Sequence, residues 1–507
     1  MGPPVPAGAA TAALPTALLA AALLAGGCAS APPPEPPDPG FPLPERWVRE
    51  EAAGEAPEPP DGTAVAPYPA AEATIQEDWW RDLGDPRLDG LVAEAFEHNR
   101  DLAAAAARVS AAEAQARIAG ADALPQAGAG FDAARRRQNF IGFPIPGGDG
   151  EVLSTTTTTF DAGLDVAWEV DLWGRLRAAE AAALAGLEAS AADYRAARLS
   201  LAGRTASAWF GLIEAAEQLE LARAEADSRR RTTERIRRRY ELGLRPALDL
   251  RLALSTQAAA EAAVPAREQA LDAARRRLEL LAGRYPAGTA GPAAGGAGPL
   301  PPVPPPVPAG LPAALIARRP DLVAAERRLA AAGLAIEQAR AALYPQLRLT
   351  GSAGRASGEL EDLLDGDFSV WSLAAGLLQP LFQGGRLRAG VDLAEARRDE
   401  ALAGFRSAAA QAFFEVEAAL AAESLLAERE AALERAVAET AAARDLAEER
   451  YDLGLVDYLT VLETQRGALS AESSLLEARR QQLDARIDLH LALGGGFAPA
   501  ASNGDPK

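Results

Sequence analysis

Apolar and polar side chains alternate along residues 160–172. Phenylalanine, leucine, valine or tryptophan recurs at nearly every second position, and three of the residues between them are Asp161, Asp165 and Glu169. Successive side chains of a strand point to opposite faces, so this period of two predicts a strand with one apolar and one acidic face.

The same alternation returns in residues 347–353. Partner strands near residue 126 and over residues 368–378 would complete two hairpins, spanning about 124–173 and 345–383. Four strands are too few to close a barrel with a polar interior, and an open edge in lipid would leave backbone groups unpaired. We therefore expect several chains to share one barrel, and three copies would supply twelve strands. A soluble sandwich is the alternative for any one strand taken alone.

Long stretches without proline surround these strands. Residues 175–240 and 386–451 each hold 66 residues dominated by Ala, Leu, Glu and Arg, which predicts helices of roughly 100 Å. Helices of that length are expected to pack along one another as coiled coil, together with the following helices at 246–282 and 457–493. A further helix is predicted over 313–343.

The chain contains two related halves. The sequence Leu-Gly-Leu at 242–244 recurs at 453–455, and the other matching motifs share this spacing once a single insertion is allowed. Such self-similarity indicates a structural repeat. The first repeat is assigned to residues 75–283 and the second to 313–496, with a Pro/Gly-rich linker at 284–312.

The N-terminus resembles a bacterial lipoprotein signal. A short apolar run ends in Leu-Ala-Gly-Gly followed by Cys28, which predicts a signal peptide over residues 1–27 and lipid attachment to the Cys28 thiol. An ordinary signal with an incidental cysteine is the alternative. Residues 28–74 are Pro-rich and are interpreted as a lipid-anchored tether, and residues 497–507 as a disordered tail.

Composition excludes several classes of function. The formal charge of −20 argues against nucleic-acid binding. The only lysine is Lys507, so no Gly-Lys-Ser/Thr phosphate loop exists, and Cys28 is the only cysteine, so no thiolate zinc cluster is possible. No ligand role is assigned to His98 or His490. We expect no enzyme, and no cofactor or metal beyond the covalent lipid.

Two short motifs are interpreted as ordinary surface. The arginine runs at 229–231 and 235–239 are predicted to lie on a solvated helix face, and the threonine run at 155–159 at the rim of the barrel.

Three longer motifs carry a family resemblance. The stretches at 168–177 (WEVDLWGRLR), 317–329 (ARRPDLVAAERRL) and 450–466 (RYDLGLVDYLTVLETQR) resemble TolC-like outer-membrane efflux proteins. The likeness is greatest to the lipoprotein branch typified by OprM and NodT, and it covers residues 75–496.

The resemblance implies an α+β membrane protein. A homotrimer would form a 12-stranded antiparallel outer-membrane β-barrel, continued into the periplasm by an α-helical coiled-coil barrel. Such proteins are passive exit ducts of tripartite export systems in Gram-negative bacteria. They contact outer-membrane lipid and dock to a periplasmic adaptor and an inner-membrane RND-type pump. The alternative function is a non-conducting structural lipoprotein that spans the periplasm.

The resemblance also assigns roles to residues at the two helix-hairpin tips. Adaptor docking would involve Tyr240, Gly243, Leu244, Gly454 and Leu455. The periplasmic aperture would be formed by Asp249, Tyr451, Asp457, Tyr458, Glu463 and Arg466. Rings of carboxylates from Asp249 and Glu463 would favour cations in the pore. For Glu463 and Arg466 the alternative is an exposed helix pair worth a few tenths of a kcal/mol.

Overall fold

The structure is a computed structural model and describes residues 37–44, 47, 78–140, 153–291, 298–304 and 312–495. The chain divides into two compact units, Met1–Asp38 and Pro39–Lys507, and every element below belongs to the second. The predicted signal peptide, Cys28 and C-terminal tail lie outside the described residues, as does most of the tether.

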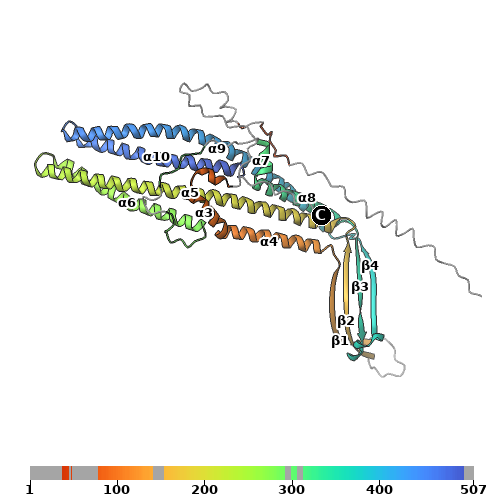
Figure 1. Cartoon of the computed structure of the whole chain (residues 1–507). Coiled ribbons are helices and arrows are strands. Elements are labelled where there is room, and N and C mark those ends of the chain that lie inside the picture. The colour runs from red at the N-terminus through yellow and green to blue at the C-terminus, as the bar shows by residue number, and fades with distance from the viewer. Residues whose placement is uncertain are drawn as a thin grey trace, which may run out of the picture. The chain divides into compact units, whose positions relative to one another are not determined.

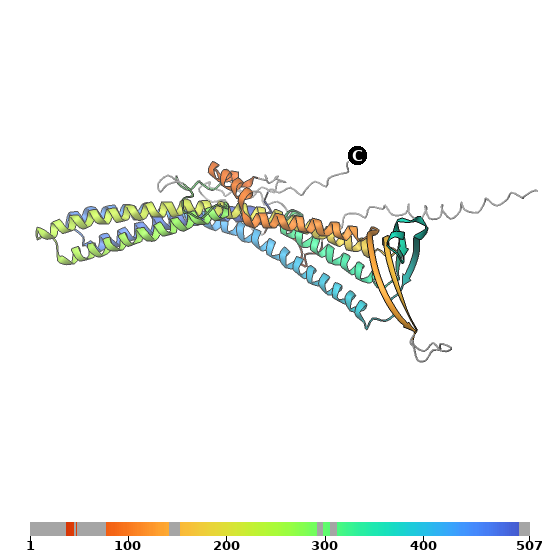
Figure 2. The same ribbon diagram turned by 90° about the horizontal axis from the view of Figure 1, so that it is seen from below.

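Each half contributes two short helices and two long ones that lie side by side (Figures 1 and 2). The long α5 and α9 each contain 67 residues, and α6 and α10 each contain 35. The first half comprises η1 (Trp79–Leu83), α3 (Pro86–His98), α4 (Arg100–Ala121), α5 (Arg175–Glu241) and α6 (Ala247–Leu281). The second comprises α7 (Pro312–Arg318), α8 (Pro320–Ala341), α9 (Arg386–Asp452) and α10 (Tyr458–Ala492). Within the described ranges, no helix is long and apolar enough to cross a bilayer.

The single helix predicted over 313–343 is wrong, because the chain breaks into α7 and α8 at Arg319. Pro320 begins α8, and a proline disfavours helical backbone in the residue before it. Arg319 accordingly has φ −70° and ψ 123°. The first half breaks in the same way at Asn99, whose side chain caps α4 by accepting from the Leu102 N–H at 3.0 Å.

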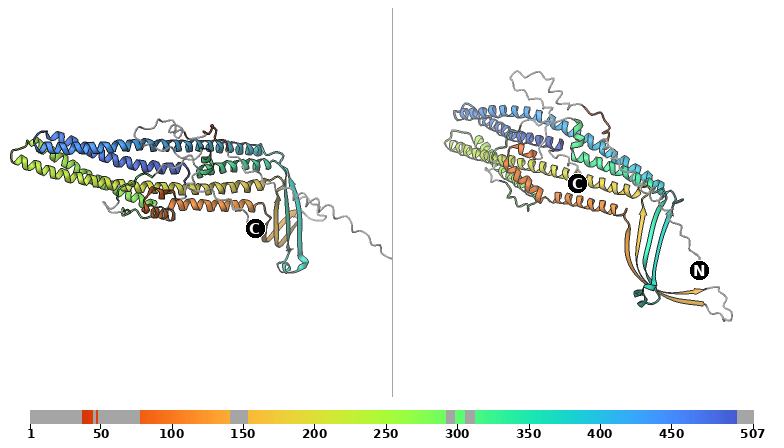
Figure 3. Two further views of the ribbon diagram at one scale, coloured as in Figure 1. Left: turned by 45° about the horizontal axis from the view of Figure 1, so that its top comes forward. Right: turned by 45° about the vertical axis from the view of Figure 1, so that its right-hand side comes forward.

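The four strands form one antiparallel sheet in the order β1-β2-β3-β4 (Figures 1 and 3). Their bounds are β1 (Gln126–Phe140), β2 (Leu153–Val170), β3 (Gln346–Ser357) and β4 (Ser369–Leu378). Short 3-10 helices η2 (Glu361–Leu364) and η3 (Gly366–Phe368) connect β3 to β4. A largely helical chain with a four-stranded antiparallel sheet is therefore confirmed. In this sheet β1 and β4 are the two edges, each paired on one side only.

The register gives the sheet two chemically different faces. Residues paired across antiparallel strands share a face. Leu164 pairs with Ala353, which pairs with Trp371, so one face is apolar. One position further along the strand, Asp165 pairs with Ser352, so the other face carries polar or small side chains. Leu164 and Trp371 are 59% and 80% exposed, so the apolar face is uncovered in the single chain.

Apolar clusters join the two halves in the middle of the helical region. One cluster includes Trp79, Trp209 and Phe210 together with Leu483 of α10. Side chains from both repeats thus share one core. Burial of such side chains at about 1.5–3 kcal/mol each holds the long helices in register.

Candidate aperture at the helix-hairpin tips

Each long helical hairpin reverses at a glycine. Gly243 and Gly454 have φ of 72° and 77°, a left-handed conformation that glycine adopts without steric cost. The N–H groups of Leu244 and Leu455 donate to carbonyls five residues earlier at 2.8 and 2.9 Å, which closes each helix as a Schellman motif. Both leucines are about two-thirds exposed (67% and 70%) and Tyr240 is 42% exposed, so the two tips present apolar side chains to their surroundings.

A hydrogen bond between helices of different repeats ties the two hairpins together. The Tyr451 hydroxyl on α9 donates to Oδ2 of Asp249, in the first turn of α6, at 3.0 Å. The Tyr451 ring lies 5.4 Å from the ring of Tyr458. The Arg245 guanidinium lies 4.0 Å from the Tyr451 ring centre and donates to the Tyr451 carbonyl at 2.5 Å. We refer to these four residues as the tip lock.

The tip lock holds Tyr451 as a neutral donor. Burial, followed by the hydrogen bond to Asp249, raises the pKa of Tyr451 to about 12. Burial also raises the pKa of Tyr458. Both phenols therefore remain protonated across the physiological range. Three of the predicted aperture residues (Asp249, Tyr451 and Tyr458) are brought together in this way, and Arg245 was not predicted.

A second link joins α5 to α9 beside the tip lock. The Asp452 carboxylate forms ion pairs with Arg239 at 3.0 Å and with Arg235 at 3.7 Å. These side chains are partly exposed, so the pairs contribute on the order of 0.2–1 kcal/mol each. Sequence reasoning missed them because they join residues more than 200 positions apart.

The interpretation of the arginine runs as solvated surface is wrong for Arg229, which is only 6% exposed. Its guanidinium donates to Glu225 at 2.5 Å and to the side-chain oxygen of Gln465 on α10. Gln465 in turn donates to Glu448 of α9 at 2.5 Å. A buried charge must be paired, and this network satisfies Arg229 between three helices.

The burial of Arg229 could have been predicted from its spacing to other residues of α5. Thr232, Thr233 and Ile236 are buried on the same helix, three, four and seven residues further on. This spacing defines one face of a helix that packs against neighbours.

The remaining predicted aperture residues, Asp457, Glu463 and Arg466, take no part in the tip lock. Asp457 caps α10, where its Oδ1 accepts from the N–H and hydroxyl of Thr460 at 2.9 and 2.7 Å. These bonds lower the pKa of Asp457. Glu463 and Arg466 are both exposed, and no ion pair joins them among the residues that the structure describes. Their role at the aperture stays a prediction.

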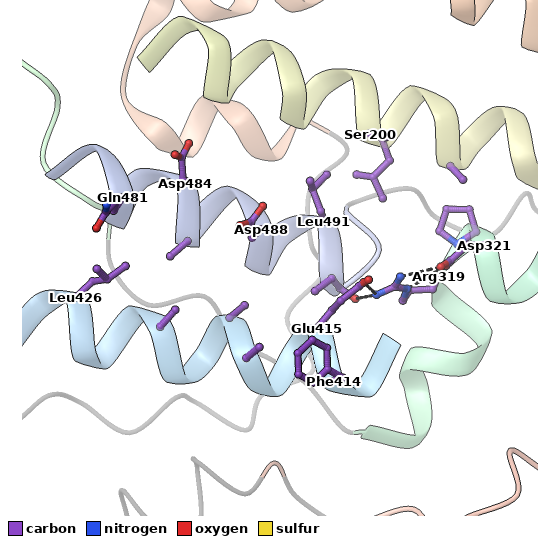
Figure 4. A pocket seen from close by; sticks show the side chains of 18 residues that line it. Ser200, Arg319, Asp321, Phe414, Glu415, Leu426, Gln481, Asp484, Asp488 and Leu491 are labelled. Atoms are coloured by element: carbon purple, nitrogen blue, oxygen red, sulfur yellow. Dashed lines mark hydrogen bonds and ion pairs between the residues drawn. The ribbon is translucent and has the colours of Figure 1, made fainter. Parts of the chain in front are cut away.

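A cavity of about 800 Å³ lies between α5, α8, α9 and α10 (Figure 4). At one end Arg319 donates to Asp321 and Glu415 at 2.7 Å each and to a backbone carbonyl of α10 at 3.1 Å, so its guanidinium serves to join helices. Asp484 and Asp488 lie on α10 away from this cluster, and burial raises the pKa of both. Within the described part of the chain no three His, Cys, Asp or Glu side chains are grouped to hold a metal.

Comparison with known proteins decides the family. A family model described as outer membrane efflux protein matches residues 91–284 and 311–495, one stretch in each repeat. The chain belongs to this family. The predicted resemblance is confirmed. This efflux protein is an exit duct, and it is located in the outer membrane of a Gram-negative bacterium.

Similar proteins cover nearly the whole chain. The efflux protein is 35% identical to the pyoverdine export outer membrane protein OpmQ of Pseudomonas putida, over 87% of this chain and 92% of OpmQ. It is 36% identical to the outer membrane protein OprJ of Pseudomonas aeruginosa, over 86% and 89% of the two chains. Among solved structures, the open state of the Neisseria gonorrhoeae MtrE outer membrane channel is 30% identical, with a TM-score of 0.76 over 92% of this chain and 98% of MtrE.

Proposed function

We propose that three copies of the chain close a 12-stranded antiparallel barrel in the outer membrane and continue it with a coiled-coil barrel of α-helices in the periplasm. The observation that carries this proposal is the four-stranded sheet with two unpaired edges and one exposed apolar face. Backbone groups at an open edge cannot remain unpaired in lipid, so each β4 must find a β1. Three copies make an even-numbered barrel in which the acidic face lines the interior.

The duct would be passive and would work with two other proteins. The exposed leucines at the tips formed by Gly243 and Gly454 suit docking of a periplasmic adaptor, which would connect the duct to an inner-membrane RND-type pump. Energy would come from the pump, and the chain itself would carry out no enzymatic reaction. The only attached group would be lipid on Cys28 after removal of residues 1–27, with the Pro-rich segment as a tether.

The tip lock would hold the periplasmic end of the duct closed at rest. It joins α6 of one hairpin to α9 of the other through a neutral phenol and a carboxylate. Opening requires the two hairpins to move apart, which breaks this bond in each copy. A bond to a charged acceptor stabilises the closed arrangement by roughly 1.5–3 kcal/mol.

Conductance of the purified protein tests the proposed function. Detergent-extracted protein should have the mass of three chains and should carry ions across a planar lipid bilayer. The competing function, a non-conducting structural lipoprotein, predicts a folded assembly without conductance. A monomeric preparation that leaves the bilayer unchanged would contradict the proposed duct.

A further inference from the structure

The edge strand β1 is basic, and the connection that leads into the other edge strand, β4, is acidic. Arg135, Arg136 and Arg137 follow one another on the edge strand β1, and all three are exposed. The connection from β3 to β4 contains five carboxylates within residues 359–367, and Asp367 lies two residues before β4 begins. Among the described residues, no ion pair links these arginines to an acid of the same chain, and Arg137 donates to the Ser154 hydroxyl at 3.0 Å.

Face and length restrict how one chain's β4 can pair with another chain's β1. The ten residues of β4 fit within the fifteen of β1 in six registers, which place Ser369 opposite residues 135–140. Ser369 pairs with Arg355, Arg355 pairs with Ala162, and Ala162 pairs with Phe131. Ser369 and Phe131 therefore lie on the same face of the sheet. Pairing must keep apolar residues on one face, because a shift of one residue exchanges the faces. Ser369 can then oppose only Arg135, Arg137 or Asn139.

Each of the three registers sets the outward-facing arginines beside the same short segment of the neighbour. In the first register Arg135 lies opposite Ser369, and Arg137 extends past the start of β4 toward η3, which holds Asp367. In the second register Arg135 lies opposite Trp371. In the third Arg137 lies opposite Trp371. Trp371 is 80% exposed in the single chain, so its ring is available. A guanidinium pairs with a carboxylate and also stacks on an indole face, so either partner satisfies it.

We infer that Arg135 and Arg137 of one subunit form an intersubunit clamp with Trp371 and Asp367 of the next subunit, on the outward face of the barrel. The inference rests on the proposed trimer and specifies how its strands meet. Arg136 points to the opposite face and takes no part in the clamp. Apolar pairing of the edges limits the contact to three registers, and in each of them the clamp adds a polar contact between the subunits.

Paired cysteines test the clamp and read the register. Arg135→Cys is combined with Ser369→Cys, and Arg137→Cys in turn with Ser369→Cys or Trp371→Cys, one pair for each register. Directly opposed residues on paired strands bring Cβ atoms to about 4.5–5.5 Å, close enough for oxidation to link them after small adjustments. One of the three pairs should give covalently linked trimers in intact outer membranes. Arg136→Cys with Ser369→Cys is the matched control and should not link, and the single-cysteine variants exclude a contribution from Cys28.

The outcomes separate the clamp from the trimer. A trimeric preparation in which none of the three pairs links, or in which the Arg136 control links equally, overturns the clamp and leaves the proposed duct intact. A monomeric preparation contradicts the duct itself. In a second measurement, replacing Arg135 and Arg137 together by alanine should lower the temperature at which the trimer dissociates, whereas Arg136→Ala should not. An unchanged dissociation temperature for the double variant would also overturn the clamp, as expected if these arginines bind lipid phosphate instead.

Discussion

Removal of the Tyr451 hydroxyl should open the duct. Tyr451→Phe keeps the ring and its contacts with Tyr458 and Arg245, and deletes only the 3.0 Å bond to Asp249. A hydrogen bond to a charged group contributes about 1.5–3 kcal/mol. Water can reach the half-buried Asp249 and replace part of that bond, so we expect a loss of about 1–2 kcal/mol in each chain.

In the proposed trimer, the three copies multiply the effect. A loss of about 3–6 kcal/mol in the trimer would change the closed-to-open ratio by roughly 10²- to 10⁴-fold, since about 1.4 kcal/mol corresponds to a factor of ten. The assay is the single-channel record in a planar bilayer, where Tyr451→Phe should raise the open probability or the conductance. In cells, the same variant should increase sensitivity to large antibiotics that the outer membrane normally excludes.

The chain offers a matched control for this substitution. Tyr240 occupies the equivalent tip position of the first repeat and is 42% exposed. Tyr240→Phe should leave the conductance at the wild-type level. The reasoning is refuted if the two variants behave alike. Combining Tyr451→Phe with Asp249→Ala should add little to either single change, because both delete the same bond.

The pH dependence of the tip lock follows from the phenol. The pKa of Tyr451 in the folded chain, about 12, lies above its ordinary value of 10. The stabilisation it provides is therefore fully present below pH 10 and is lost as the pH rises from 10 through 12. Closure should be insensitive to deprotonation of this phenol between pH 6 and 8.

Three further predictions concern stability and selectivity. His490 is 1% exposed, and burial lowers its pKa to about 3. The free energy of unfolding should therefore be highest above pH 6.5 and should fall by about 2 kcal/mol between pH 6.5 and 5, because the unfolded chain takes up a proton that the folded chain does not. His490→Phe should remove that decline in urea unfolding, and an equal decline in the variant would contradict this assignment. Gly243→Ala should lower the free energy of unfolding by about 1–2 kcal/mol, because Gly243 has a positive φ. Gly211→Ala is the control: it lies within α5 with free space around it and should raise the free energy of unfolding by about 0.5–1 kcal/mol. Thermal unfolding measures both. Replacing Asp249 and Glu463 together by alanine should shift reversal potentials away from cation selectivity, and unchanged potentials would exclude the proposed carboxylate rings.

Periodicity in the sequence indicated the kinds of element and their approximate extent. Alternation over residues 160–172 is local information, because it reflects only which face of a strand is apolar. The proline-free stretches and the glycines at 243 and 454 are local signals too, because each determines the backbone conformation at its own position. The break at Arg319 was missed although Pro320 signals it, because the apolar pattern continues on both sides.

Contacts between distant residues were decided by the tertiary structure. Tyr451 and Asp249 are 202 positions apart, and no local pattern states that the two side chains meet. The inward direction of Arg229 and the partners of Asp452 depend in the same way on how two hairpins pack. Sequence alone thus determined the two repeated hairpin-and-helix modules and their amphipathic faces, because those properties reside in short stretches of backbone. Only the tertiary structure decided which side chains close the tips, because that depends on the relative rotation and register of helices joined by a long connection.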